Sequence, residues 1–355
     1  MWLGKTDYPK RKTMSKKIVS FEAMRFMFML MICLWHYQGS NGIFSHGYLG
    51  VEFFFILSGI LLYHSVSKTS PTDPLDYTIK KVKRFFPKYF CSVIIALLIF
   101  EIIPVITHGK DVGIHTIISW LNFIPESFMV HDIGIFEPWG GHNYPLWYIT
   151  ILVWGGGWLY ACIYFYRKPV INIILPPLVL CGYVYLFNLS DRNMIEHWGT
   201  AVFIQKEMLR GICDMGLGIM MAYLYEQKAQ FFTNHRQLFS ILSFLSFIFA
   251  IILCLSKYDL DSYYLIFLSL VFIGCLQPES LFNKTFNASY WQSLGHVTYS
   301  MLLLHAPIIY ICNSIKGKIG GSNEVIEAFG YLFIVVMCSF IYDYCFAMIR
   351  KANNT

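Results

Sequence analysis

Charge is scarce in this chain of 355 residues. Charged residues make up 14% of it, against about 25% in a typical soluble domain, while 56% of its residues are hydrophobic and 18% aromatic. The sequence also contains no internal repeat, no low-complexity segment and no linker rich in Ser and Gly. These absences argue against a solvated multidomain chain and favour a single domain that lies within a membrane.

Metal-ligand spacing is missing as well. The ten cysteines form no CxxC pair and lie within apolar stretches, and no two histidines have the spacing H-x3-H. Zinc sites need such ligands close together. We therefore expect the cysteines to pack as small hydrophobic residues, and we predict no metal.

Long apolar runs fill the chain instead. Ten stretches approach or reach the roughly 17–25 residues that cross about 30 Å of hydrocarbon, and none shows the period-2 alternation of a membrane strand. They lie near residues 18–38, 48–66, 89–107, 146–166, 170–188, 202–225, 238–256, 262–277, 294–313 and 326–349. The sequence thus predicts an all-α integral membrane protein, a bundle of about ten transmembrane helices.

Basic residues are distributed unevenly between the connections. They cluster before the first span and between the second and third, whereas the opposite side has few: Lys110, Arg192, Lys257, Lys316 and Lys318. The positive-inside rule then places both termini in the cytoplasm. We expect a cytoplasmic basic segment over 1–17, the membrane domain over 18–350 and a short cytoplasmic tail over 351–355. The net charge of +6 fits this topology and attraction to membrane lipid, with no nucleic acid as partner.

Ionisable residues interrupt the first two apolar runs. Arg25 and His36 are eleven residues apart, and eleven steps of about 100° return a helix almost to the same face, roughly 16 Å further along. Glu52 follows in the second run. A charged group inside a bilayer costs at least about 2.5 kcal/mol on insertion scales, so such residues are functional candidates. We predict a catalytic site inside the membrane.

These residues belong to a longer pattern. Arg25-x10-His36, followed by GVEFFFILSG at 50–59, resembles the R-x10-H and G-V-[DE]-x-F-F-x-x-S-G of the membrane-bound acyltransferase family 3. Similar blocks cover roughly residues 16–350: KVKRFFP at 81–87, PLWY at 145–148, Arg210-Gly211 with Gly216 and Gly218, and GHVTYSMLLLHAP at 295–307. Two positions depart from the family: its first loop arginine is Lys81 here, which loses the planar fork, and Leu152 stands where many members carry glutamate.

The resemblance implies O-acyl transfer from cytoplasmic acyl-CoA to a hydroxyl of a cell-surface or lipid-linked glycan. Acetyl-CoA is the expected donor and co-substrate, with another short acyl group left open. The expected location is the bacterial plasma membrane, as a multi-pass protein and possible homodimer. A membrane exporter or flippase of a polysaccharide or lipid-linked sugar is the alternative, although it would be expected to show inverted repeats, and none is detectable.

A sugar hydroxyl is a weak nucleophile, so a base must accept its proton as it attacks the thioester. We predict His36 as that base, because imidazole titrates near neutral pH, with Glu52 fixing its tautomer. Pairing of Glu52 with a membrane arginine is the alternative. Arg25, about three turns nearer the cytoplasm, joins the catalytic set along the donor channel, with helix–helix pairing as its alternative.

The remaining predicted site residues form two groups. Donor binding is assigned to Arg25, Ser58, Lys81, Lys83, Arg84 and Arg210. The alternative for the loop cations Lys81, Lys83 and Arg84 is that they only set the membrane topology. The alternative for Arg210 is an ion pair with Asp214. Acceptor binding is assigned to His142, Asn143, Trp147, Tyr148 and His305, with a structural role as the alternative for His305. The outer loop 108–145 is a further candidate for acceptor recognition because it mixes polar and aromatic residues. The alternative is that its aromatic residues form a belt at the membrane edge.

Overall fold

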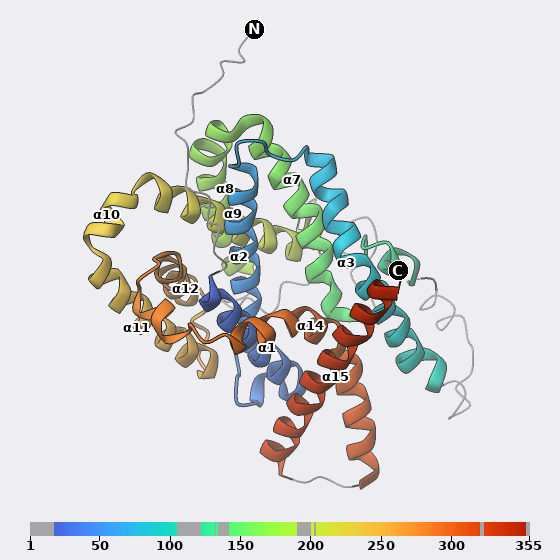
Figure 1. Cartoon of the computed structure of the whole chain (residues 1–355). Helices are drawn as coiled ribbons and strands as arrows, with labels where there is room; N and C mark the ends of the chain where they lie inside the picture. Colours follow the sequence, from blue (N-terminus) through green and yellow to red (C-terminus); the bar gives the residue numbers. More distant parts are fainter. Residues whose placement is uncertain are drawn as a thin grey trace.

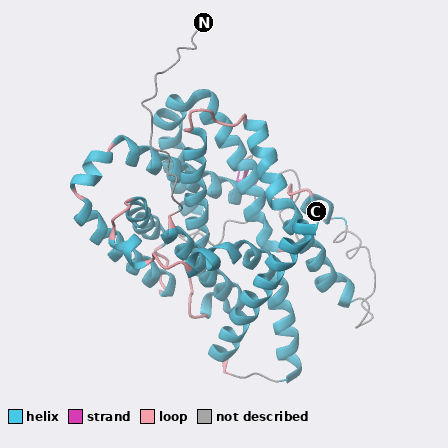
Figure 2. Cartoon of the chain, viewed as in Figure 1, coloured by secondary structure: helices cyan, strands magenta, loops and turns pink. Residues whose placement is uncertain are grey.

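The computed structural model describes residues 18–104, 121, 123–131, 133, 142–189, 200–201, 204–319 and 323–352. The basic segment 1–17, most of the 108–145 loop (including His108, His115, Asp132 and Glu137) and residues 353–355 lie outside the described residues. Helices dominate the described part (Figure 2), and one short antiparallel ladder joins β1 (Thr200–Ala201) to β2 (Ile204–Gln205). The predicted helical class is therefore confirmed for this part of the chain.

The long helices form a bundle (Figure 1). They are α1 (Val19–Gln38), α2 (Gly50–Val66), α3 (Pro74–Leu97), α7 (Trp147–Pro169), α8 (Leu175–Leu189), α9 (Lys206–Gln227), α11 (Arg236–Leu255), α12 (Asp261–Leu276), α14 (Tyr290–Ile319) and α15 (Glu324–Ala352). The shorter elements are η1 (Gly39–Asn41), η2 (Gly47–Leu49), η3 (Leu98–Ile102), α6 (Phe123–Ser127), η4 (Tyr144–Leu146), η5 (Val170–Ile174), α10 (Ala229–Asn234) and α13 (Leu281–Thr285).

Seven helical stretches of the described residues are long and apolar enough to cross a membrane. One of them, Tyr144–Asn188, has 45 residues and contains two predicted spans, which separate near Tyr166, where the backbone leaves helical geometry (φ −133°, ψ 49°). The seven stretches thus overlap eight of the ten predicted spans. The other two correspond to α9, whose Arg210 and Asp214 lower its hydropathy, and to α12, which has only 16 residues.

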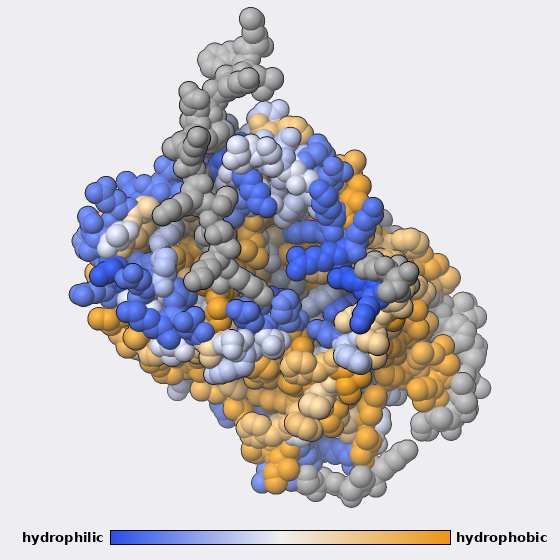
Figure 3. All heavy atoms as spheres, in the orientation of Figure 1, coloured by the Kyte–Doolittle hydropathy of each residue, from blue (hydrophilic) through white to orange (hydrophobic). Residues whose placement is uncertain are grey.

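Hydrophobic side chains cover much of the outer surface. On the face in Figure 3 they gather over the lower half and the right-hand side, while hydrophilic residues gather above them and in a smaller group at the bottom. Large apolar residues are exposed along α11 and α15, among them Ile241, Ile252, Phe333 and Ile341. Such a continuous apolar belt between polar ends fits a protein surrounded by lipid.

Small residues allow α2 and α9 to pack backbone against backbone. A Cβ atom built at Gly59 would meet the main-chain oxygen of Met215, and one built at Gly218 would meet the main-chain oxygen of Ile56. Close helix contacts of this kind are typical of membrane bundles, where small residues let two helices approach. This contact fixes the rotation of α2, and with it the direction in which its acidic residue points.

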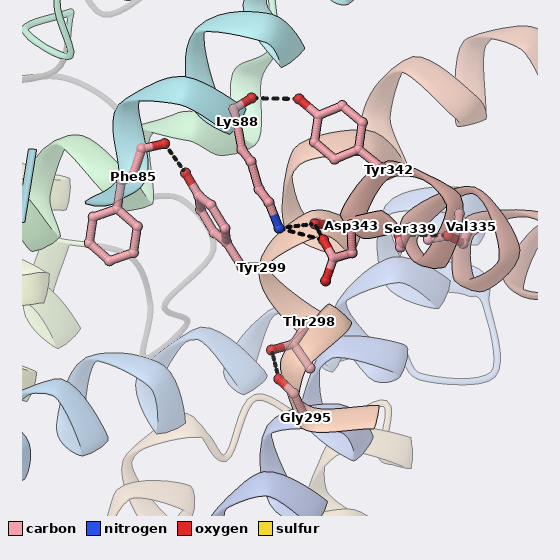
Figure 4. A network of polar contacts seen from close by, with 10 residues as sticks. Phe85, Lys88, Gly295, Thr298, Tyr299, Val335, Ser339, Tyr342 and Asp343 are labelled. Atoms are coloured by element: carbon pink, nitrogen blue, oxygen red, sulfur yellow. Dashed lines mark hydrogen bonds and ion pairs between the residues drawn. The ribbon is translucent and has the colours of Figure 1, made fainter. Parts of the chain in front are cut away.

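A polar network ties α3 to α14 and α15 (Figure 4). Lys88 Nζ lies 2.6 Å from Asp343 Oδ1, and Ser300 donates a hydrogen bond to the same carboxylate. The hydroxyls of Tyr299 and Tyr342 donate to the carbonyls of Phe85 (2.9 Å) and Lys88 (2.6 Å). These contacts surround Pro87 and hold the basic part of α3 against α14.

Candidate active site

A cavity of about 620 Å³ runs between α1, α2, α3, α7, α9 and α14. Its wall on α1 is a single stripe at helical spacing: Ile18, Phe21, Glu22, Arg25, Met29, Ile32, Trp35 and His36. The prediction that Arg25 and His36 share one face is confirmed. From Ile18 to His36 the stripe extends roughly 27 Å, close to the ~30 Å thickness of the hydrocarbon layer.

His36 lies at one end of this cavity, in the last turn of α1. Its Nδ1 is 3.0 Å from the carbonyl oxygen of Ile32. A carbonyl oxygen only accepts, so Nδ1 carries the hydrogen, and the neutral ring keeps its lone pair on Nε2. The rings of Trp35 (4.7 Å), His305 (4.9 Å) and Tyr144 (5.3 Å) surround it. A backbone carbonyl therefore fixes the tautomer that a base requires.

Glu52 has a different partner from the one expected. It is fully buried and accepts hydrogen bonds at Oε1 from Nε (2.7 Å) and Nη2 of Arg210. A hydrogen bond or ion pair between Glu52 and His36 is not among the contacts of the described residues. Glu52 points toward α9 because it shares one face of α2 with Ile56 and Gly59, at i, i+4 and i+7. Ile56 and Gly59 pack on α9. The alternative interpretation, a pair with a membrane arginine, is the observed one.

Arg210 lines the cavity on α9. Its Cζ lies 5.8 Å from the centroid of the Trp147 ring, a cation–π distance. Asp214, the partner considered for it, accepts a 2.6 Å hydrogen bond from Tyr183. Arg25 pairs along its own helix, with Nη1 3.0 Å from Glu22 Oε2, and both side chains face the cavity.

The two departures from the family pattern are in contact. Lys81 Nζ donates a 3.2 Å hydrogen bond to the carbonyl oxygen of Leu152, and both residues line the cavity. The lysine ammonium has three N–H donors, so this bond leaves others for a ligand, whereas the planar arginine fork suits a carboxylate. Lys83 and Arg84 are both exposed, but only Arg84 lines the cavity.

Of the predicted acceptor residues, Trp147 and Tyr148 line the cavity. His142 and Asn143 do not: their backbone N–H groups each donate a 2.8 Å hydrogen bond to the buried carboxylate of Glu126, bracing the turn before η4. His305 is fully buried beside His36, with 4.9 Å between the ring centroids, and its Nδ1 lies 2.9 Å from the Leu302 carbonyl oxygen.

Glu126 was not predicted from the sequence, where its only signal is an acidic residue directly after Ile124-Pro125.

Ser58 also lines the cavity, and its hydroxyl donates to the Phe54 carbonyl (2.7 Å). All ten cysteines are free, and the described residues contain no group of three or more His, Cys, Asp or Glu side chains that could hold a metal ion.

The cavity thus combines several cations with an imidazole lone pair at one end, inside a helical bundle with an apolar surface. A family model described as an acyltransferase domain, that of acyltransferase family 3, matches residues 18–344. The chain therefore belongs to this family and is a membrane acyltransferase. No curated protein and no solved structure matches it.

Proposed function

We propose that this acyltransferase moves an acyl group, acetyl in the first place, from cytoplasmic acyl-CoA to a hydroxyl of a cell-surface or lipid-linked glycan. The observation that carries the proposal is the cavity that reaches from Lys81 and Arg84, past Arg25, to His36. Cationic side chains suit the phosphates of the donor, and the mainly apolar lining of the cavity suits its pantetheine arm. The length of the cavity lets a cytoplasmic donor present its thioester near the far side of the membrane.

His36 is the general base in this mechanism. Its Nε2 accepts the hydroxyl proton as the acceptor oxygen attacks the thioester carbonyl, and the tetrahedral intermediate then expels the CoA thiolate. The imidazolium returns the proton to that sulfur, so the products are an ester and CoA. Direct transfer is preferred over a covalent enzyme intermediate because no cysteine lines the cavity within the described residues, and the Ser58 hydroxyl is bonded to a backbone carbonyl.

The proposal includes a topology of ten spans with both termini in the cytoplasm, in a bacterial plasma membrane. Helix directions support it: α1 runs parallel to α14, α2 runs parallel to α9, and α15 returns antiparallel to α14. The contacts that give these directions are Glu22 with Gly295, His36 with His305, Glu52 with Arg210, Tyr63 with Glu226, Ser300 with Asp343, and His305 with Tyr331. In a bundle whose spans alternate in direction, spans one and nine are parallel, and so are spans two and six. Spans nine and ten are antiparallel.

Mass spectrometry of the surface polysaccharide, with and without the protein, tests the function. We expect ester-linked acyl groups to disappear from cells that lack the protein or carry His36→Gln, while the amount of surface glycan stays the same. The exporter alternative predicts the opposite result, a loss of the glycan itself with normal acylation of whatever remains.

Donor binding gives a prediction with an internal control. Lys81→Gln and Arg84→Gln should each raise the KM for acetyl-CoA several-fold and leave the acceptor KM unchanged, because these cations face the cavity. Lys83→Gln removes the same charge from the same helix at an exposed position outside the cavity, so it should leave both constants unchanged. Equal effects of all three substitutions would indicate a general effect of loop charge on topology or lipid attraction.

A further inference from the structure

The guanidinium of Arg210 has unused donors that can face the cavity. Nε and Nη2 both donate to Oε1 of Glu52, whereas no hydrogen bond of Nη1 is among the contacts of the described residues. Arg210 itself lines the cavity. Its charge is thus held in place by a carboxylate on one side while part of its planar fork stays available to a ligand.

Three other polar donors around the cavity donate to protein acceptors, whereas the neutral Trp35 Nε1, which also lines it, has no partner among the described residues. Arg25 Nη1 donates to Glu22, Lys81 Nζ to the Leu152 carbonyl, and the Tyr48 hydroxyl to Asp261 at 2.8 Å. Of the cavity's cations, Lys81 and Arg84 lie in the first half of α3. Arg210 is therefore the cation best able to offer a charged donor near the histidine.

Helix ends place Arg210 at that end of the cavity. α1 finishes with His36 in its last turn, and α2 starts on the same side with Glu52 in its first turn. Arg210 contacts both Glu52 and Trp147, the first residue of α7. The sequence assigned Arg210 to donor binding, but the cations suited to the donor's phosphates lie toward the opposite end.

We infer that Arg210 is a further catalytic residue, which stabilises the negative charge that develops on the thioester carbonyl oxygen during acyl transfer. The inference rests on the proposed function. When the acceptor oxygen bonds to the carbonyl carbon, the carbonyl π electrons move to oxygen, and an Nη1 hydrogen bond meets that charge inside the helical bundle. Removing one such preorganised donor typically lowers kcat by about 10²–10³-fold. Glu52 is then a positioning residue for Arg210 rather than for His36.

Kinetics and infrared spectroscopy together test this role. Arg210→Gln should lower kcat about 10²–10³-fold and leave the KM for acetyl-CoA within about twofold, since the interaction forms mainly in the transition state. With isotope-labelled acetyl-CoA bound and no acceptor present, the thioester carbonyl stretch should lie at lower frequency in the unsubstituted protein than in Arg210→Gln. A raised donor KM with normal kcat would instead make Arg210 a donor-binding residue and overturn the inference.

Arg210→Gln leaves Glu52 buried without its cation, which can prevent folding. The double variant Glu52→Gln/Arg210→Gln removes both charges together and should show the same loss of kcat and the same unshifted carbonyl. Normal kcat in a folded double variant would overturn the inference. If the unsubstituted protein binds acetyl-CoA but its thioester carbonyl stretch has the same frequency as in Arg210→Gln, only the inference about Arg210 fails. If it does not bind acetyl-CoA at all, the proposed donor fails with it.

Discussion

Replacing His36 by glutamine is expected to lower kcat by about 10²–10⁴-fold while acetyl-CoA still binds. Glutamine can keep a hydrogen bond to the Ile32 carbonyl and fill much of the same space, but it has no lone pair basic enough to take a proton from a hydroxyl. The loss should therefore appear in kcat rather than in the donor KM. Steady-state kinetics on the purified protein, with radiolabelled acetyl-CoA and a model glycan, measures both.

His235 offers a matched control. Its Nδ1 lies 3.0 Å from the carbonyl oxygen of Phe231, the same i, i−4 arrangement that His36 makes with Ile32, but it is exposed and outside the cavity. His235→Gln should retain full activity. The pH profile of the unsubstituted protein should have an ascending limb that His235→Gln keeps and His36→Ala loses.

Two results would count against a single displacement with His36 as the base. Parallel lines in a double-reciprocal plot would indicate a ping-pong mechanism, whereas transfer in a ternary complex gives intersecting lines. An acyl-protein trapped with radiolabelled acyl-CoA in the absence of acceptor would point the same way, and His36 would then be the first residue to test as the acylated nucleophile.

Properties that depend on one helix alone were readable from the sequence. The stripe from Arg25 to His36 follows from helical periodicity, and the apolar runs predict the helical class of the described chain. Span number was harder, because α9 combines a buried arginine and aspartate with several glycines and so lacks the hydropathy of a typical span. Its charged residues meet partners on α2 and α8, which lie far away in the sequence.

The partner of Glu52 could not be read locally for a related reason. A short connection shows that α1 and α2 are neighbours, but it does not determine which face of α2 turns toward α1. That rotation follows from the contact of α2 with α9, which joins residues 158 positions apart. His142 and Asn143 illustrate the same limit: the sequence does not show that their backbone N–H groups donate to Glu126 or that the two residues lie outside the cavity lining.

Substitution of Gly59 by alanine is expected to lower the free energy of unfolding strongly. The added Cβ would meet the main-chain oxygen of Met215, so a rotamer change cannot relieve the overlap and the helices must separate. Overpacking typically costs about 1–3 kcal/mol, which corresponds to a fall of roughly 5–10 °C in Tm for the upper part of that range in a large domain. Gly218→Ala, which meets the Ile56 carbonyl, should act similarly.

Gly330→Ala is the control for this change, because a Cβ built at that position on α15 has no other atom within 4 Å. Alanine favours a helix over glycine by about 1 kcal/mol, so this variant should match or exceed the unsubstituted Tm. Thermal unfolding in detergent, followed by fluorescence-detected size exclusion, compares the three variants. Equal Tm values for Gly59→Ala and Gly330→Ala would contradict the close α2–α9 contact. Because that same contact aims Glu52 at Arg210, Gly59→Ala should also lower kcat in whatever protein remains folded, whereas Gly330→Ala should not.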